Sequence, residues 1–183
     1  MTITRKNRKQ NKTLTICNSR YALCTSAPCK KIPNKKGKTL CKCTVETGYN
    51  FATKSCNKLR PRKMKNGTRR IYSTFSINEL NDGKKITECP KNNEWSDCLN
   101  HKCVVDPKNS KKALCECMLR KSNKNWFTMG AKNNNKLCKK SKWSGAYKKD
   151  FYKTRKFWNS YFEKKANHDG KIIGNPENII NRL

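Results

Sequence analysis

The fold is decided by residues 17–56, which read CNSRYALCTSAPCKKIPNKKGKTLCKCTVETGYNFATKSC. Residues 89–138 repeat the pattern as CPKNNEWSDCLNHKCVVDPKNSKKALCECMLRKSNKNWFTMGAKNNNKLC. The cysteine spacings are C-x6-C-x4-C-x11-C-x-C-x12-C and C-x8-C-x4-C-x11-C-x-C-x20-C, with identical inner gaps. Matched residues flank the cysteines, namely Pro33 with Pro107 and Leu40 with Leu114. Two matched sets of six cysteines, 74 residues apart, form an internal repeat.

The composition excludes a large enzyme with one continuous core. Leu, Ile, Val and Phe account for only 29 of the 183 residues, and 44 Lys and Arg against 12 Asp and Glu give a net charge of +32. Such a composition is typical of disordered chains. Burying so few apolar side chains, at roughly 1.5–3 kcal/mol each, cannot balance an ordering entropy of about 1–2 kcal/mol per residue. Covalent bonds or a partner must therefore stabilise any fold.

The twelve cysteines are candidate disulfides or candidate zinc ligands. A structural zinc site takes four ligands, often as C-x2–4-C pairs, and the second to fifth cysteines of each repeat could supply one. The first and sixth would then be left over, so an even six favours three bridges per repeat, no metal, and an oxidising setting. The candidate disulfide cysteines are Cys17, Cys24, Cys29, Cys41, Cys43, Cys56, Cys89, Cys98, Cys103, Cys115, Cys117 and Cys138.

This spacing resembles an EGF-like domain, with four residues between the second and third cysteines, a CxC pair and a distant sixth cysteine. Gly48-Tyr49 is similar to the Gly-aromatic turn in that family's last loop. The resemblance covers 17–56 and 89–138, about half of the chain, and implies a small disulfide-rich fold of two EGF-like β-hairpin modules. The implied bridges are Cys17–Cys29, Cys24–Cys41, Cys43–Cys56, Cys89–Cys103, Cys98–Cys115 and Cys117–Cys138.

Local geometry supports part of this expectation and limits the rest. Cys41 and Cys43 lie on one strand face and cannot easily bridge each other, so each needs its own partner. The stretches 33–37 and 106–110 are turn signals that would each fold a short hairpin. Neither repeat opens with the cluster of acidic residues that calcium-binding members of the family carry, so we expect no calcium and no other cofactor.

The chain divides into five segments. A basic arm (1–16) precedes the first module (17–56), and a basic linker (57–88) precedes the second (89–138). In the linker, β-rich residues at 71–77 predict a strand. The last segment, 139–183, is predicted to be a basic, aromatic α-helix followed by a tail.

The helix prediction rests on aromatic residues at helical spacing. One interpretation is a helix that packs these rings on the modules. The other, which we favour because disulfide modules need little outside packing, is a partner-binding helix. The candidate partner-binding residues are Trp143, Tyr147, Phe151, Trp158 and Phe162.

The charge predicts a polyanion as partner. Residues 1–75 hold 20 Lys and Arg but a single acid, Glu46. A nucleic acid, an acidic polysaccharide or another anionic surface would fit. The alternative is a compositional bias, since Asn is also frequent. The candidate polyanion-binding residues are Lys58, Arg60, Arg62, Lys63, Lys65, Arg69 and Arg70.

Compartment and catalysis are less strongly indicated. Residues 1–16 have no apolar signal-peptide region, and no apolar run reaches the length of a transmembrane helix. Disulfides then predict either secretion with a removed signal or a virion that makes its own disulfides. The two histidines, His101 and His168, are expected at the surface, and no catalytic motif is present.

The sequence thus predicts a non-enzymatic, disulfide-stapled structural protein. Its work would be to bridge or cement protein partners in a larger assembly, or to bind a polyanion. The alternatives are a secreted adhesion or receptor-ligand-like EGF protein and a zinc-dependent nucleic-acid-binding protein.

Overall fold

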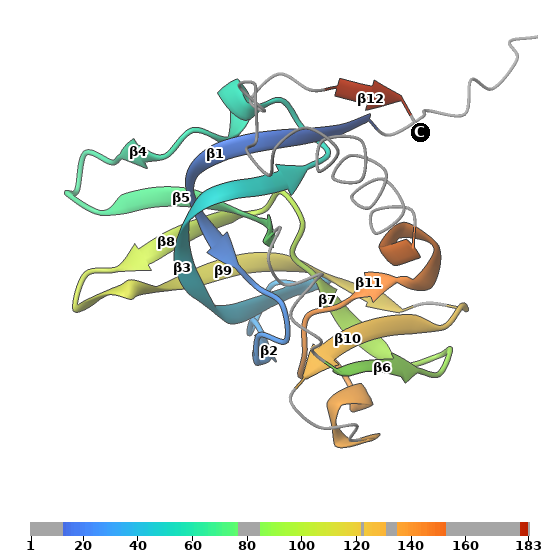
Figure 1. Ribbon diagram of the computed structural model, residues 1–183. Helices are drawn as coiled ribbons and strands as arrows, with labels where there is room; N and C mark the ends of the chain where they lie inside the picture. The colour runs from blue at the N-terminus through green and yellow to red at the C-terminus, as the bar shows by residue number, and fades with distance from the viewer. Residues whose placement is uncertain (1–12, 77–84, 122, 131–134, 153–179, 183) are drawn as a thin grey trace, which may run out of the picture.

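Extended strands make up nearly all the regular structure of the computed structural model, which describes residues 13–76, 85–121, 123–130, 135–152 and 180–182 (Figure 1). The strands come from Thr-, Tyr- and Ile-containing segments that are bounded by turn residues, as expected for β-structure. The first five strands are β1 (Thr13–Leu23), β2 (Cys29–Lys31), β3 (Lys38–Ala52), β4 (Arg62–Lys63) and β5 (Arg69–Ser76). The next six are β6 (Lys85–Cys89), β7 (Glu94–Asp97), β8 (Lys102–Asp106), β9 (Asn109–Lys121), β10 (Trp126–Gly130) and β11 (Ala146–Tyr147). The remaining elements are the 3-10 helices η1 (Cys56–Leu59) and η3 (Asn135–Cys138) and the strand β12 (Ile180–Arg182).

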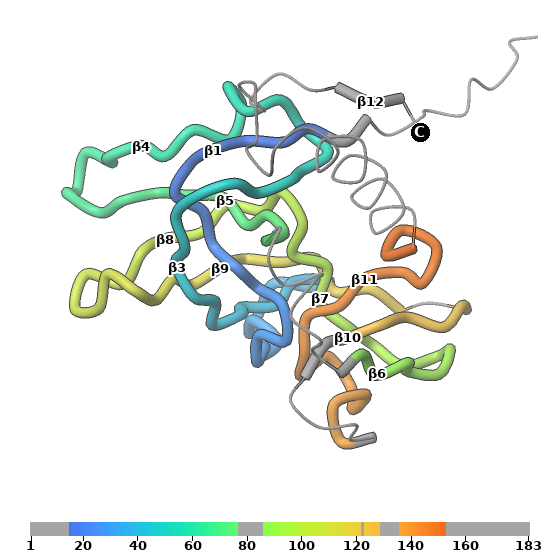
Figure 2. The backbone as a smooth tube through the Cα atoms, in the orientation of Figure 1, coloured from blue at the N-terminus to red at the C-terminus, as the bar shows by residue number. Residues whose placement is uncertain are grey.

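Five of the strands close on themselves. β1 pairs with β3, β3 with β9, β9 with β8 and β8 with β5, all antiparallel. β5 then returns to β1 in a short parallel pairing, with Ala22 opposite Ser73 and Leu23 opposite Thr74. The chain path in Figure 2 shows strands from both halves of the sequence side by side in this arrangement. A smaller sheet of β11, β10 and β6 lies beside it.

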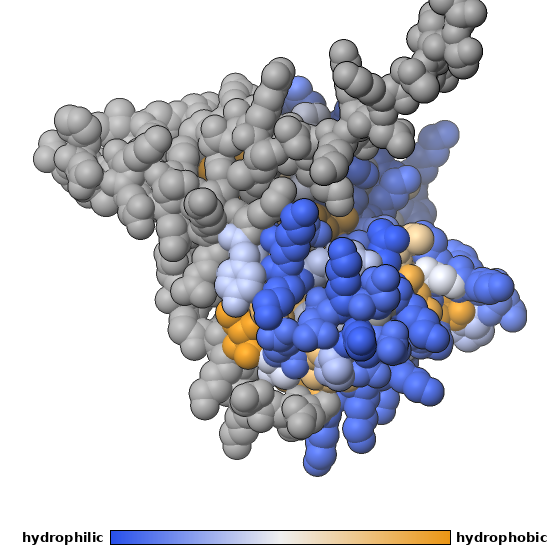
Figure 3. All heavy atoms as spheres, turned by 90° about the vertical axis from the view of Figure 1, so that its right-hand side faces the viewer, coloured by the Kyte–Doolittle hydropathy of each residue, from blue (hydrophilic) through white to orange (hydrophobic). Residues whose placement is uncertain are grey.

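The C-terminal helix is short in the described residues, where it covers 148–152. The prediction of a helix that includes Trp143 and Tyr147 is wrong, because Trp143 forms a β-bridge with Pro28 and Tyr147 lies in β11. Within the described ranges no helix combines the length and the apolar composition that crossing a membrane requires. The described atoms on the face seen in Figure 3 are mostly hydrophilic.

An internal two-fold symmetry relates the two halves of the molecule. In the β3–β9 ladder Cys41 lies opposite Cys115, its own counterpart 74 residues later. On either side of this pair, Thr39 faces Cys117 and Cys43 faces Ala113. Ala113 is the counterpart of Thr39, and Cys117 is the counterpart of Cys43, each 74 residues later. The symmetry therefore exchanges the two pairs. Such a register places a two-fold pseudo-axis at the Cys41–Cys115 pair.

The structural repeat is longer than the cysteine repeat. The parallel β-bridge between Ser96 and Ser144 in the second half corresponds to the parallel pairing of Ala22 with Ser73 in the first. The pairing of β10 with β11 likewise corresponds to the pairing between the ends of β3 and β5. We therefore name residues 13–76 the first unit and residues 85–152 the second unit. Strand β5 lies in the predicted linker and hydrogen-bonds to strands of both units.

All twelve cysteines form disulfides, but the EGF-type pairing is wrong. Each unit joins its first cysteine to its sixth, its second to its fifth and its third to its fourth. The hairpin turn explains the innermost bridge, since it places Cys29 directly opposite Cys41, with 4.1 Å between their Cα atoms. Such close Cα atoms are typical of non-hydrogen-bonded antiparallel pairs. The bridges are Cys17–Cys56, Cys24–Cys43, Cys29–Cys41, Cys89–Cys138, Cys98–Cys117 and Cys103–Cys115.

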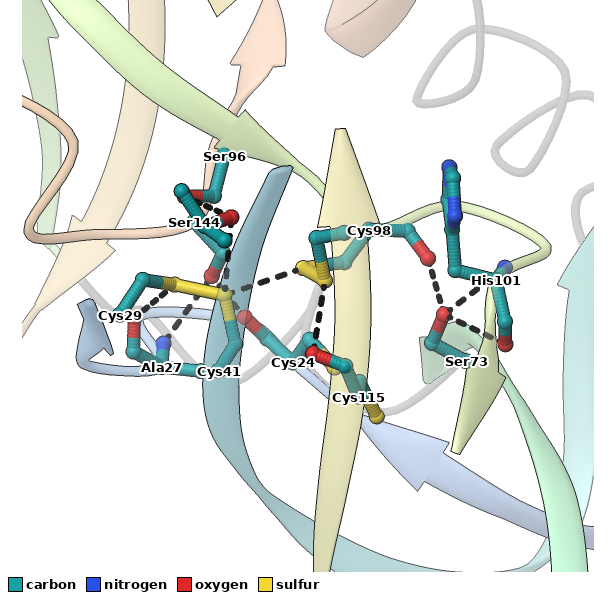
Figure 4. The surroundings of a disulfide bond; sticks show 12 residues. Cys24, Ala27, Cys29, Cys41, Ser73, Ser96, Cys98, His101, Cys115 and Ser144 are labelled. Carbon is teal, nitrogen blue, oxygen red and sulfur yellow. Dashed lines mark hydrogen bonds between the residues drawn. A yellow bond between two sulfur atoms is a disulfide. The ribbon is translucent and has the colours of Figure 1, made fainter. Parts of the chain in front are cut away.

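The main core consists largely of sulfur. Eight of the thirteen buried residues in its central cluster are the cysteines of the four inner bridges, joined by alanines and by Ile71 and Val105. Bridges of different units touch, with 3.5 Å between the sulfurs of Cys98 and Cys41 (Figure 4). Disulfides here supply the buried surface that the chain's few aliphatic residues cannot supply.

These six intramolecular disulfides make the chain a disulfide-stabilised protein of the extracellular type. Bonds of this kind persist in an oxidising environment and are rare where glutathione keeps thiols reduced. A sulfur in a disulfide has no thiolate to offer to zinc, so the disulfide alternative of the sequence analysis is the one that the structure shows.

Candidate polyanion-binding surface

The predicted cationic residues lie together on one projecting hairpin and the segment that leads into it. Lys58 lies in η1, Arg60 follows it, and the other five lie in β4, in the turn or in β5. Six of the seven side chains are exposed, and Arg70 is half-buried. We name the hairpin of residues 62–70 the basic hairpin; it forms the left-hand edge of the view in Figure 1.

A tight, locally satisfied turn closes the basic hairpin. Gly67 has a φ of +80°, a left-handed conformation that glycine adopts without strain. The backbone N–H of Met64 donates to the Thr68 carbonyl at 2.8 Å, and the Thr68 hydroxyl donates to the Asn66 side chain at 2.7 Å. The turn therefore fixes how the two short strands face each other.

The strand register places like charges opposite each other. Arg62 faces Arg70, and Lys63 faces Arg69. Like charges directly opposite in an antiparallel pair are destabilising. Among the described residues, no carboxylate forms an ion pair with any of the seven cations.

Two acids of the second unit pair with lysines of the first unit. Glu94 pairs with Lys31 at 2.7 Å, and Glu116 pairs with Lys35 at 2.9 Å. These bridges join the second unit to the β2–β3 hairpin of the first. A hydrogen bond from Lys35 lowers the pKa of Glu116. Its carboxylate is therefore ionised at neutral pH and offsets part of the charge of the β2–β3 hairpin, while the basic hairpin keeps its charge.

Glu88 also forms an ion pair, here with a lysine of its own unit. It lies 3.1 Å from the Lys148 ammonium, and a hydrogen bond from Asn125, with Lys148, lowers the pKa of Glu88. Asp97 likewise pairs with Arg120 at 3.1 Å. The first unit has a single acid of its own, Glu46. The charge asymmetry read from the sequence is therefore also an asymmetry of the folded surface.

The second unit adds further cations next to the basic hairpin. β5 pairs with β8, so that Tyr72 lies opposite Lys102 and Arg70 opposite Val104. Lys102 is exposed, as are Lys108 and Lys111 near the turn between β8 and β9. Nothing in the sequence singles out these lysines, because only the β5–β8 pairing joins their hairpin to β5.

The aromatic residues predicted to bind a partner pack on the chain itself where they are described. Trp143 is half-buried beside Pro28. The rings of Tyr147 and Trp95 meet edge-on with 5.0 Å between centroids, and Phe151 packs on Phe127 at 5.4 Å. Trp158 and Phe162 lie outside the described residues. The three described rings thus follow the packing interpretation, and nothing here tests the partner-binding one.

Two serines that were not among the predicted site residues tie the units together. The Ser73 hydroxyl donates to the carbonyl of Cys98, and the Ser144 hydroxyl donates to the carbonyl of Cys24 (Figure 4). These are matched contacts across the pseudo-axis, since Cys24 and Cys98 are counterparts. The one sequence signal is an aromatic–serine pair at 72–73 and again at 143–144.

Comparison with protein-family models, with curated proteins and with solved structures finds no match to this chain. The chemistry of the surface alone therefore carries the functional argument.

Proposed function

We propose that this protein is a non-enzymatic, extracellular-type interaction protein that binds an acidic polysaccharide through the basic hairpin. The observation that carries the proposal is the register of that hairpin, in which Arg62 faces Arg70 and Lys63 faces Arg69 without a neutralising carboxylate among the described residues. A bound chain of sulfates or carboxylates would neutralise these pairs.

The fold gives these cations a rigid base. β5 pairs with β8 and with β1, next to the disulfide core, and Ile71 of β5 is fully buried in that core. The backbone that carries Arg69 and Arg70 is thus fixed before a ligand binds, and preorganisation of this kind favours affinity. Cations that served only to keep the surface soluble would not need a strand that is fixed to the core.

The surroundings favour a polysaccharide over a nucleic acid. Proteins that bind single-stranded nucleic acids stack bases on exposed aromatic rings. Among the described residues the exposed aromatic side chain is Tyr152, which lies in the C-terminal helix and not on the hairpin. Tyr72 is half-buried, with the guanidinium of Arg70 6.0 Å above its ring. The oxidising setting that the disulfides indicate is also one in which acidic polysaccharides are available.

Binding of heparin by the full chain tests this proposal. We expect affinity to fall steeply as salt rises, because each cation–anion contact releases counterions, with a log–log slope of about −0.9 per contact on duplex DNA. The variant R62Q/K63Q/K65Q/R69Q should weaken binding at least about tenfold at low salt and flatten that slope.

The matched control is K30Q/K42Q/K121Q/K149Q, which removes the same charge from exposed lysines elsewhere. It should lose much less affinity than the hairpin variant. Equal losses would reduce the effect to net charge, and wild-type protein that does not bind heparin at low salt would refute the proposal. Duplex DNA bound more tightly than heparin would identify a nucleic acid as the partner instead.

A further inference from the structure

A second cluster of cations occupies the place in the second unit that the basic hairpin occupies in the first. In both units the basic segment follows the sixth cysteine and precedes the aromatic–serine pair. In the first unit this segment is 57–71, and in the second it shortens to 139–142. A groove is present there, which we name the lysine groove. It is lined by Pro90, Asn93, Cys138, Lys139, Lys140 and Lys142.

The segment that lines the lysine groove is attached to the first unit in the way that β5 is attached to the second unit. The N–H of Cys29 donates to the carbonyl of Lys142 at 2.8 Å, which attaches the groove segment to β2 of the first unit. Across the pseudo-axis, β5 is attached to β8 of the second unit, where Ile71 lies opposite Cys103, the counterpart of Cys29. Each unit therefore places its basic segment on the outer side of the other unit's hairpin.

The two clusters lie on different parts of the strand arrangement. The order across the sheet is β4, β5, β8, β9, β3, β2 and then the segment with Lys142. β5 also pairs with β1 and with β3, so the strands close on themselves and this order is not a straight line between the two clusters. Figure 1 shows the basic hairpin at the left and the turn of η3, which ends at Cys138, at the bottom.

The chemistry of the groove suits an anion on a ring. Lys139, Lys140 and Lys142 are exposed, and among the described residues no carboxylate forms an ion pair with them. Pro90 and the Cys89–Cys138 bridge supply an apolar part of the wall, and Asn93 supplies an amide. Ammonium groups around a partly apolar surface fit a sulfated or carboxylated sugar.

We infer that the lysine groove is a second anion site and that the protein is bivalent, so that one molecule bridges two polysaccharide chains. This inference rests on the proposed function of the basic hairpin. Since the two sites lie on different sides of the molecule in Figure 1, a short oligosaccharide reaches one of them, whereas different long chains can occupy both. Bivalency converts weak single sites into a stable cross-link by raising the effective concentration for the second contact.

Calorimetry with a short heparin oligosaccharide measures the number of sites directly. Wild-type protein should bind about twice as many oligosaccharides per molecule as K139Q/K140Q/K142Q and as R62Q/K63Q/K65Q. The control K30Q/K42Q/K121Q should keep the wild-type stoichiometry. Light scattering with long heparin should show large cross-linked particles for wild type and control, and not for either site variant. Unchanged disulfides and far-UV circular dichroism would show that each variant is folded.

The outcomes separate the two proposals. A groove variant with unchanged stoichiometry and unchanged cross-linking would overturn bivalency and leave the basic hairpin as the single site. Binding that is lost in the groove variant and kept in the hairpin variant would support the groove but refute the proposed function of the hairpin. Cross-linking by wild type at a stoichiometry of one would show self-association of the protein instead of two sites.

Discussion

The first unit pairs β1 with β3 in one continuous ladder, whereas the second unit splits the matching ladder in two. Pairing in the first unit runs without a break from Thr15–Ala52 to Leu23–Thr44. In the second unit β7 pairs with β9 and β6 pairs with β10, in different sheets. The second unit has two more residues between its first and second cysteines than the first unit, and residues 90–93 form the break.

An even insertion explains why the second unit still folds in the same way. Side chains alternate between the two faces of a strand, so two extra residues preserve which face each following residue occupies. Tyr21 and its counterpart Trp95 are accordingly both buried, and so are Phe51 and its counterpart Phe127. The second unit shows that a strand can be interrupted and bent while the corresponding side chains stay buried.

The second unit fills its bent end with larger rings. Trp126 occupies the place of Asn50, and Tyr147 the place of Ser76. Trp126 stacks on Trp95 with 5.8 Å between ring centroids, and both are buried with the Cys89–Cys138 bridge. The first unit has no tryptophan, so among the described residues the tryptophan cluster around this bridge belongs to the second unit alone.

The largest expected effect tests whether the inner bridges of the two units are equivalent. C29A/C41A and C103A/C115A should each lower the free energy of unfolding by about 2–5 kcal/mol, because each removes a bridge and buried sulfur from the shared core. Guanidinium denaturation followed by circular dichroism measures both losses. Similar losses support the pseudo-symmetry, whereas a large loss in one unit alone would break it.

Peptide mapping of the unreduced wild type provides the control for this prediction. Digestion should release peptides joined by the nested bridges, such as Cys17–Cys56 and Cys89–Cys138. Peptides joined as Cys17–Cys29 or Cys117–Cys138 would restore the EGF-type pairing and contradict the structure.

A smaller effect is expected where the aromatic cluster makes the units differ. A Cβ atom on Gly145 would lie 2.6 Å from both the Phe127 carbonyl oxygen and the Trp126 ring. G145A should therefore destabilise the protein by about 1–3 kcal/mol, as over-packing does. Thermal unfolding followed by circular dichroism measures this.

The matched control is T74A, because Thr74 is the counterpart of Gly145 in the first unit and already carries a Cβ atom. It should change the melting temperature much less than G145A. An unchanged melting temperature in G145A would show that Trp126 has room to move and that the glycine is not required.

The smallest expected effect is a pH dependence that the first unit lacks. His101 is the counterpart of Ala27, and burial lowers the pKa of His101 below 6.5. The unfolded chain then binds a proton more readily than the folded one, so stability falls as pH drops from 6.5 towards the folded pKa. H101A should flatten this part of the stability curve, which denaturation at a series of pH values measures.

Glu88 and Glu116 serve as the internal control for that curve. Their pKa values are lowered from 4.5, so they also make the folded state less stable in acid, but at lower pH than His101. H101A should leave this lower part of the curve unchanged. A wild-type curve that is flat just below pH 6.5 would contradict the assignment to His101.

Local signals in the sequence predicted local structure well. The turn at 33–37 separates β2 from β3, the turn at 106–110 lies where β8 meets β9, and the β-rich residues at 71–77 overlap β5. The rule that Cys41 and Cys43 need separate partners also holds. Each of these predictions depends on the conformation of a few neighbouring residues, which their types largely set.

Longer-range predictions failed where they relied on resemblance or on periodicity. Cysteine spacing matched an EGF-like domain, but the same spacing also fits the nested pairing. Trp143 and Tyr147 have helical spacing, yet contacts with distant strands hold both in extended backbone. The N–H of Ser96, for example, donates to the carbonyl of Trp143 at 3.1 Å. Such non-local hydrogen bonds override a local pattern.

The sequence by itself determined the internal repeat, the oxidation of all twelve cysteines, the hairpin turns and the surplus of positive charge. Only the tertiary structure decided which cysteines pair, that the units interlock through Ser73 and Ser144, and that the basic segments lie apart on the molecule. The physical reason is distance. A disulfide requires Cα atoms that lie close together, and within each unit strand pairing creates that proximity. The β2–β3 register places Cys29 opposite Cys41, and the β1–β3 ladder ends at Leu23–Thr44, next to Cys24 and Cys43.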